Sequence, residues 1–350
     1  MQYSDFKSLN SFTFPAIRGV QAGREFYIVM AQLRQIPRIF MFDEQEVPPE
    51  LRAQRVLNKA RIPKIVSYVL NNKDNYVFSA LTASIDGEPI FHPLGENSPI
   101  GNLEVPMDAT LLINDGQHRR AAIEQAIAEA PELGYESIPV VFFVDVGLKQ
   151  SQQMFADLNK HSIRPTQSLS ILYDHRDVLS RKVLRLAETV DLFKGRIEKE
   201  KSSISNRSRK LFTLSALYNA NKHIFSDVKT SSPQQIEKDF NFAKEYWNFL
   251  SEIIKPWVLV KEDKLSAYEF RKEFTVGHAV LLETLGMVGG QFKELRNWKE
   301  KIRPLEKIDW SRSNPQWDGL AVEKGRMVKK PSNVIGTFDF LMEWVEKGGE

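Results

Sequence analysis

Cysteine is absent from this sequence. Its absence excludes disulfide bonds, thiolate nucleophiles and cysteine-ligated zinc or iron–sulfur sites. Long apolar runs are missing too, because no stretch approaches the roughly 18 consecutive apolar residues that indicate a transmembrane helix. The N-terminus has neither the basic start nor the apolar core of a signal peptide. We therefore expect a cytoplasmic protein with no membrane partner.

Sequence signatures of common nucleotide and metal sites are also absent. Neither GxxxxGK[ST] nor GxGxxG occurs, so the sequence predicts neither a P-loop nor a Rossmann site. Neither HxxxH nor HExxH occurs, although His118, His161 and His175 lie near aspartates in the sequence. We therefore predict no metal ion held by protein side chains, while Mg²⁺ stays open as a cofactor of a phosphate-handling site.

What the sequence does contain is typical of a globular chain long enough for two domains. Its 350 residues are 42% hydrophobic and 27% charged. Strand-like and helical segments alternate through the first half, and strand signals largely vanish after residue 165. We predict an α+β protein, with an α/β domain over residues 1–165 and a mostly helical domain over residues 166–350.

The first predicted core strand is GREFYIVMAQLRQI, which is rich in β-branched and aromatic residues. Within it we expect the side chains of Phe26, Ile28, Met30 and Leu33 to point into the core. Residues 50–72 then have a helical pattern, which Pro63 interrupts because proline is not tolerated in a helix interior. We predict two helices there, with Pro63 in the first turn of the second.

Further elements of the first half follow from their apolar patterns. The patterns predict a strand from residue 76 that ends in a turn at Asp86–Gly87, further strands at residues 107–115 and 137–146, and helices from residue 117 and over residues 148–161.

The second half shows apolar residues at helical spacing. Trp247, Phe249, Trp257 and Tyr268 lie among other apolar residues, so we expect them in the core and not as platforms for base stacking.

The segment LLINDGQHRRAAIEQAIAE joins a predicted strand to a predicted helix. Asn114 or Asp115 is a candidate N-cap, and Gly116 permits a close backbone approach or an unusual backbone angle. The amides of residues 116–119 would then point outward from the positive end of the helix, which favours an anion. His118 and the two arginines after it would add donors that suit phosphate oxygens.

A purely structural interpretation of this turn is equally compatible with its composition. The helix would then be capped, and its arginines would face solvent. Cations at a helix N-terminus oppose the helix dipole unless an anion or an acidic side chain offsets them. Both interpretations remain open at this point.

The most basic window of the chain is FKGRIEKEKSSISNRSRK. The net charge of +3 is too small to indicate nucleic-acid binding by itself, so the distribution of charge matters more. A basic loop over residues 194–210 could neutralise several DNA phosphates, or could be an ordinary solvated loop. Arg55 and Arg61, on the two helices around Pro63, could form a second basic face. The predicted DNA-binding residues are Lys194, Arg196, Lys199, Lys201, Arg207, Arg209, Lys210, Arg55 and Arg61.

The string Asp115-Gly116-Gln117-His118-Arg119 resembles the signature of DGQHR-domain proteins, a branch of the ParB/sulfiredoxin-like fold. Within that branch the chain resembles the DndB family of DNA phosphorothioation, or sulfur modification, proteins. The resemblance extends, in order and spacing, to FPAIRGVQAGREFYI, RVLNKARIPKIVSYVLNN and MFADLNKHSIRPTQSLSI. It implies a small mixed sheet in the first domain and a phosphate-binding turn.

The resemblance also implies ligands. Sulfiredoxin binds ATP through Gly-Cys-His-Arg, so ATP or another nucleotide is the implied cofactor here. Gln117 replaces the cysteine of that motif, so the reductase chemistry of sulfiredoxin does not carry over. ParB-like proteins place a Glu-Asn motif after the last strand, and Asn159 is the comparable residue. The implied phosphate-binding residues are Asp115, Gly116, Gln117, His118, Arg119, Arg120 and Asn159.

DndB-type proteins are DNA-binding regulators of the gene clusters that put sulfur into the DNA backbone. The implied function is a DNA-binding accessory or transcriptional regulatory protein, with double-stranded DNA and other phosphorothioation proteins as partners. One alternative is an ATP-hydrolysing or DNA-nicking enzyme that uses Asp115, His118 and Arg119 in catalysis. Another is a scaffold that docks the modification enzymes on its helical half. The sequence leaves open which nucleotide binds and whether the chain forms a homo-oligomer.

Overall fold

The computed structural model describes residues 11–40, 58–144, 153–154, 157–158, 165–225, 227–228 and 230–349. The chain divides into two compact units, Met1–Ile163 and Arg164–Glu350. The boundary predicted after residue 165 falls two residues beyond this division.

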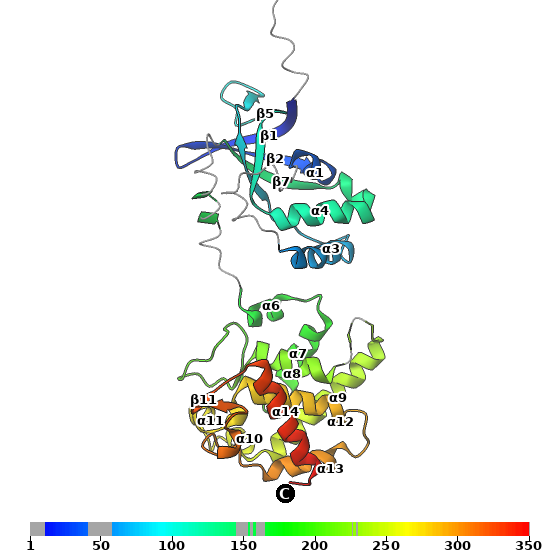
Figure 1. Cartoon of the computed structure of the whole chain (residues 1–350), viewed down its shortest axis with the longest axis vertical. Helices are drawn as coiled ribbons and strands as arrows, with labels where there is room; N and C mark the ends of the chain where they lie inside the picture. Colours follow the sequence, from blue (N-terminus) through cyan, green and yellow to red (C-terminus); the bar gives the residue numbers. More distant parts are fainter. Residues whose placement is uncertain are drawn as a thin grey trace, which may run out of the picture. The chain divides into compact units, whose positions relative to one another are not determined.

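The first unit contains a seven-stranded mixed sheet (Figure 1). Its strands are β1 Ser11–Gln21, β2 Arg24–Gln32, β3 Leu81–Asp86, β4 Ile90–Pro93, β5 Ile100–Pro106, β6 Thr110–Asp115 and β7 Ser137–Val144. The spatial order is β4-β5-β1-β2-β7-β3-β6. Only β3 and β7 pair in parallel, and the other neighbours are antiparallel. The predicted α+β class with a mixed sheet is therefore confirmed.

One face of this sheet is covered by helices, which lie together on one side of it in Figure 1. These are α1 (Ile36–Ile39), α3 (Ile62–Leu70) and α4 (Gln117–Glu129). Side chains from α1 and α4 join the apolar core of the sheet, and α3 packs against α4. The covering helix α4 is the one that starts at the DGQHR turn, so the turn lies at the edge of a well-packed core.

The predicted inward face of the first core strand is wrong. Tyr27, Val29 and Ala31 of β2 are at most 4% exposed, whereas Ile28 and Met30 are 38% and 55% exposed on the opposite face. Phe26 lies on that face as well, and Leu33, just after the strand, is buried as predicted. Because both sets of alternating residues are apolar, the alternation does not distinguish the two faces of the strand.

Strands β1, β4 and β5 were not among the predicted elements. Pro15 lies within β1, and proline normally indicates a strand end or an edge. It is tolerated here because β1 pairs with β2 only from Ala16 onward. Strand β4 is short and largely exposed, so it carries little apolar signal.

The predicted helices of the first unit agree with the structure where it describes them. Pro63 lies in the first turn of α3, and α4 begins at Gln117. The predicted helix before Pro63 and the helix over residues 148–161 lie mainly outside the described residues.

The second unit is mainly helical, as predicted. Its helices are α6 Gln167–Tyr173, α7 Val178–Thr189, α8 Leu214–Ile224, α9 Pro233–Ile253, α10 Lys255–Lys261, α11 Ala267–Glu273, α12 Ala279–Phe292, α13 Trp298–Ile302 and α14 Pro331–Glu346. Two short ladders, β8 Ile197–Glu198 with β9 Phe212–Thr213 and β10 Val322–Glu323 with β11 Arg326–Met327, complete the unit. Across the described part of the chain, no helix has the length and apolarity needed to cross a membrane.

Large aromatic side chains form the centre of this unit. Trp247 and Trp257 are fully buried and Phe249 is 8% exposed, so the core prediction is confirmed for them. It is wrong for Tyr268, which is 46% exposed. Tyr268 lies on the short helix α11, in which only Phe270 is buried, so the apolar residues near it in the sequence do not surround it in space.

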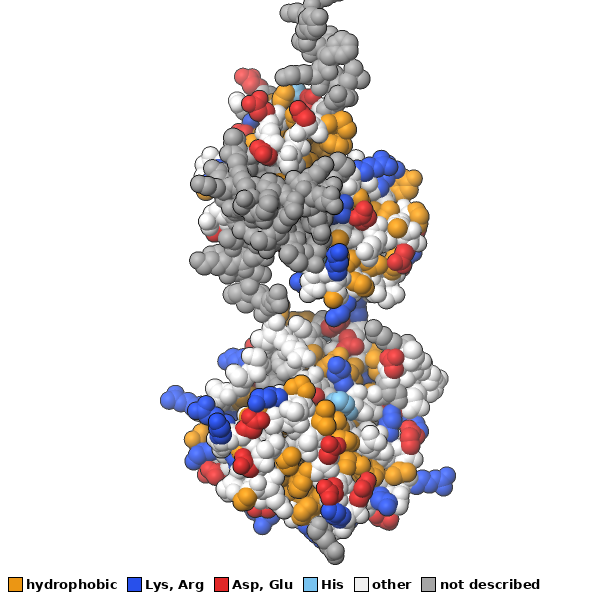
Figure 2. Space-filling view, in the orientation of Figure 1, with side chains coloured by type: hydrophobic (Ala, Val, Ile, Leu, Met, Phe, Trp, Pro, Cys, Tyr) orange, Lys and Arg blue, Asp and Glu red, His pale blue; other side chains and the backbone are white. Residues whose placement is uncertain are grey.

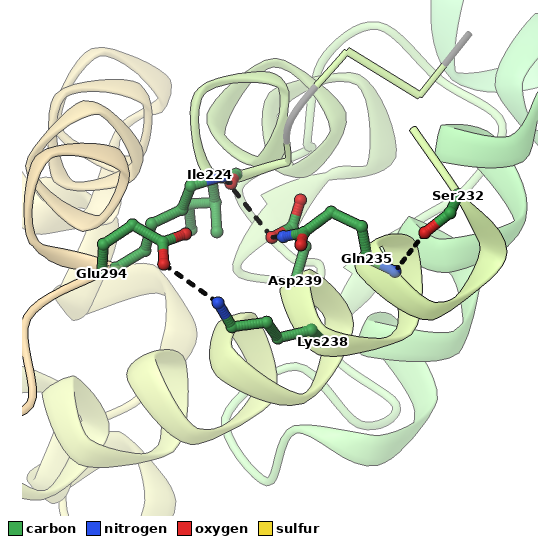
Figure 3. Close-up of polar contacts among 7 residues, drawn as sticks. Ile224, Ser232, Gln235, Lys238, Asp239 and Glu294 are labelled. Atoms are coloured by element: carbon green, nitrogen blue, oxygen red, sulfur yellow. Dashed lines mark hydrogen bonds and ion pairs between the residues drawn. The ribbon is translucent and has the colours of Figure 1, made fainter. Parts of the chain in front are cut away.

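A buried ion pair joins α9 to the helices around it. Ser232 caps α9 by accepting a hydrogen bond from the Gln235 amide (Figure 3). The Gln235 side chain donates to Asp239, which is 2% exposed. Lys293 Nζ lies 3.4 Å from Asp239 Oδ1 and donates to the Ile224 carbonyl at 3.1 Å. The pair is thus embedded between α8, α9 and the end of α12.

We expect Lys293→Met to lower the free energy of unfolding by about 3 kcal/mol, because it leaves the buried Asp239 carboxylate without its cation. The matched control is Lys238→Met. Lys238 pairs with Glu294 at 2.9 Å, but both side chains are more than half exposed, so the loss should stay below about 1 kcal/mol. Urea unfolding of the two variants checks this, and equal losses would contradict it.

Candidate functional site

The DGQHR turn depends on a glycine. Gly116 is the N-cap of α4 and has φ +106°, a left-handed value that favours glycine. A Cβ atom here would lie 2.4 Å from Leu81 Cδ2 and 3.0 Å from Arg119 Nη2. The expected N-cap at Asn114 or Asp115 is wrong, because both residues still belong to β6. The turn is tighter than a side-chain-capped helix start would be.

Arg119 attaches this turn to the beginning of β3. Its Nη2 donates to Asp115 Oδ2 at 2.7 Å and to the Ala80 carbonyl at 3.1 Å, and its Nη1 donates to Ser79 Oγ. Asp115 is therefore the acid that offsets a cation at the helix start. Its side chain is half exposed, whereas that of Arg119 is 20% exposed.

Two buried polar atoms beside the turn have no hydrogen-bond partner among the described residues. They are Asn114 Oδ1 and Arg119 Nε. Asn114 is 1% exposed, and its Nδ2 donates to Ser84 Oγ at 2.6 Å and to Met154 Sδ at 3.2 Å. The start of α4 has no side-chain cap and no acidic residue in its first turn, so its first amides stay available. Buried atoms of this kind are normally satisfied by protein, water or a ligand.

The surroundings of His118 favour the neutral form of its ring. Its burial, and secondarily the nearby positive charge of Arg61, lower the pKa of the imidazole. His118 Nε2 accepts a hydrogen bond from the Asn58 amide at 3.2 Å, so the ring proton is assigned to Nδ1. The fold thus brings Arg61 close to the turn, which makes it part of the same positively charged surface.

Arg120 and Gln117 have mainly structural contacts. Arg120 is 9% exposed and donates to the carbonyls of Phe40 and Pro37 and to Glu124, so its guanidinium ties α4 to α1. Gln117 donates from its side chain to the Ile113 carbonyl at 3.3 Å. Their assignment to phosphate binding stays a prediction.

The basic loop contains both paired and unpaired cations. Lys199 forms an ion pair with Glu188 at 2.7 Å, Lys210 donates to the Gly195 carbonyl, and Arg196 lies 4.0 Å from Asp263. The other cations are exposed and have no ion pair within the described part of the chain. These are Lys194, Lys201, Arg207 and Arg209. In Figure 2, Lys and Arg side chains project from the helical unit on the side where Figure 1 shows this green loop.

One side chain far away in the sequence holds the basic loop in place. Arg271 of α11 donates from Nη1 to the Lys210 carbonyl and from Nη2 to the carbonyls of Ser205, Asn206 and Ser208 at 3.1–3.3 Å. No sequence pattern links Arg271 to a loop some 60 residues earlier, so this contact is not predictable from the sequence.

Two of the predicted site residues fall in segments that the structure does not describe. Arg55 and Asn159 lie outside the described residues. In the part that the structure describes, no group of three or more His, Asp or Glu side chains is arranged to hold a metal ion.

Comparison with known protein families gives one match. The model of DndB, described as DNA-sulfur modification-associated, matches residues 14–347. The chain belongs to the DndB family. The match includes both the DGQHR turn and the basic loop, and it gives this family member a role in a DNA sulfur modification system. No curated protein and no solved structure matches the chain.

Gly116→Ala tests the turn. We expect it to lower the free energy of unfolding by about 3 kcal/mol, because alanine is strained at this φ and its Cβ would collide with Leu81. Gly23→Ala is the control, since Gly23 has φ +76° with nothing within 4 Å of its Cβ position, and should cost about 1 kcal/mol. Thermal unfolding distinguishes the two, and a turn variant no worse than the control would contradict the contact.

Proposed function

We propose that this DndB-family protein is a DNA-binding accessory and regulatory protein of the sulfur modification system. In this proposal the turn at Asp115–Arg119 binds a phosphate of a nucleotide or of DNA, and the basic loop contacts the DNA backbone. Its partners would be double-stranded DNA and other proteins of the system, in the cytoplasm.

The observation that carries the first part is the pair of unsatisfied buried atoms at an uncapped helix start. Arg119 Nε is a donor and suits a phosphate oxygen, as do the first amides of α4. Asn114 Oδ1 is an acceptor, so it requires a donor such as a hydroxyl group, an amino group or a bridging water. A nucleotide offers both kinds of group, which a bare anion does not.

The second part is supported by the exposed cations of the basic loop that form no ion pair within the described part of the chain. A DNA backbone supplies negative charge at regular spacing, and each contact releases counterions. Because Arg271 already holds the loop backbone, the exposed side chains are presented on an ordered segment.

The enzyme alternative has less support from the geometry. Arg119 holds Asp115 through Oδ2, and His118 Nε2 accepts the Asn58 amide, so the ring nitrogen that could act as a base is already occupied in this arrangement. A phosphate-sensing switch needs only the binding geometry, with Mg²⁺ as a companion of the nucleotide where one is required.

The DNA part of the proposal predicts a salt-dependent affinity. The combined variant Lys201→Ala, Arg207→Ala and Arg209→Ala should weaken duplex binding and reduce the slope of log K against log salt by about 2 to 3 units. Lys238→Ala is the control, because Lys238 lies on α9, outside the basic loop, and is paired with Glu294. Fluorescence anisotropy over a salt series measures both quantities. A slope that the combined variant leaves unchanged would exclude the loop as the DNA contact.

The turn part predicts a nucleotide-dependent stability. One of ATP, CTP or GTP should raise the melting temperature, because a ligand that binds only the folded state stabilises it. His118→Ala should reduce this shift, whereas His175→Ala, at an exposed histidine of the other unit, should not. Hydrogen exchange should show protection at residues 111–122. Turnover that His118→Ala abolishes would favour the enzyme, and no shift with any nucleotide would contradict nucleotide binding.

A further inference from the structure

A cavity of about 540 Å³ lies in the helical unit, behind the basic loop. Ser202, Ser203 and Asn206 of the loop form one wall, and α11, the beginning of α12 and residues 211–216 form the others. Its volume is within the range of roughly 300–1,000 Å³ that small-molecule sites occupy. The cavity belongs to the second unit and is separate from the DGQHR turn.

The lining of this cavity is positively charged. It includes Arg271, Lys272 and Arg312, and none of the described residues that line it is acidic. Among the described residues, the one ion pair that involves these three cations joins Lys272 to Glu273 at 3.2 Å, and Glu273 does not line this cavity. Three cations around a concave space therefore share one partial counter-charge.

The cations differ in how many donors they retain. Both terminal nitrogens of Arg271 already donate to loop carbonyls. Arg271 therefore contributes positive charge to the cavity more than free hydrogen-bond donors. Arg312 uses Nη2 on the Gly325 carbonyl at 2.6 Å, and its Nη1 and Nε have no partner among the described residues. Arg312 is held beside α11 because its amide donates to the Glu273 carbonyl. It is the donor best placed to bind an anion in the cavity.

Two further groups line the same space. His278 is the N-cap of α12 and has no side-chain cap bond, and its Nε2 donates to the Arg271 carbonyl at 2.8 Å. Burial lowers the pKa of His278 to about 4, so the ring is neutral and adds no charge at neutral pH. Tyr268, which is 46% exposed, lies one helical turn before Arg271 and Lys272 on α11. An exposed aromatic ring beside cations is the combination that binds a base together with its phosphate.

We propose that this cavity is a second phosphate site, which binds one nucleotide with its phosphate on Arg312 and Lys272 and its base on Tyr268. The nucleotide could be free or could be the unpaired end of a DNA strand, since both present the same groups. The site needs neither the DGQHR turn nor duplex binding by the loop.

The test uses the full-length protein and three probes: deoxyadenosine monophosphate, deoxyadenosine, and a short single-stranded oligonucleotide with a 5′-phosphate. Calorimetry should show binding of the monophosphate, the oligonucleotide or both, and at least tenfold weaker binding of the nucleoside. Binding of the monophosphate alone indicates a free nucleotide, and binding of the oligonucleotide alone indicates a strand end. Hydrogen exchange should show protection within residues 200–212 and 266–280.

Variants locate the contacts. Arg312→Ala and Tyr268→Ala should each weaken binding about tenfold, whereas Tyr268→Phe keeps the ring and should bind like the original protein. Lys222→Ala, at the far end of α8, is the surface control and should bind like the original protein. Protection confined to residues 111–122, or no binding of any phosphorylated probe, overturns the cavity site. The first of these results would still support the DGQHR turn, so the two proposals fail separately.

Discussion

The N-terminal unit depends on the close approach between the backbone at Gly116 and the Leu81 side chain at the start of β3. The approach leaves no room for a Cβ atom, and it brings Arg119 within reach of Ser79 and Ala80. The packing of the strand against the helix and the phosphate binding proposed for the turn therefore depend on the same residue, Gly116.

In the second unit, the charged side chain of Arg271 has a comparable role, because it holds the basic loop in place. Arg271 donates hydrogen bonds to several backbone carbonyls of the basic loop, a segment that forms almost no regular structure of its own. A basic segment is expected to repel itself, and Arg271 places a further, partly buried cation against it. Carbonyl dipoles stabilise the arrangement because they point their negative ends at the guanidinium, while the side chains of Arg207 and Arg209 are exposed.

Much of the architecture could be predicted because it follows from local patterns. Pro63 located a helix start, the apolar spacing after Gln117 located α4, and the helical spacing after residue 165 indicated the second unit. The errors have a common cause, which is that local patterns do not say what surrounds a residue. The apolar residues of β2 could face either way, and Tyr268 has apolar neighbours in sequence but not in space.

The candidate site could be predicted from the sequence only in part. The DGQHR string identified the turn, but the ion pair between Asp115 and Arg119 and the core position of Arg120 depend on how β6 and α4 meet. No sequence pattern predicts the roles of Arg271 and Arg312, because these roles arise only when α11 is folded against residues 205–210. Contacts across such sequence separations are set by topology and not by spacing.

The hydrogen bonds from Arg271 to the basic loop have a consequence for the thermodynamics of the proposed DNA binding. A loop that orders only on meeting its partner loses conformational entropy at that moment, which weakens the complex. Here four carbonyls are already bound in the free protein. The entropy of the loop backbone is lost during folding, so the DNA binding proposed for the loop would be dominated by counterion release and would carry only a small entropic penalty from the loop itself.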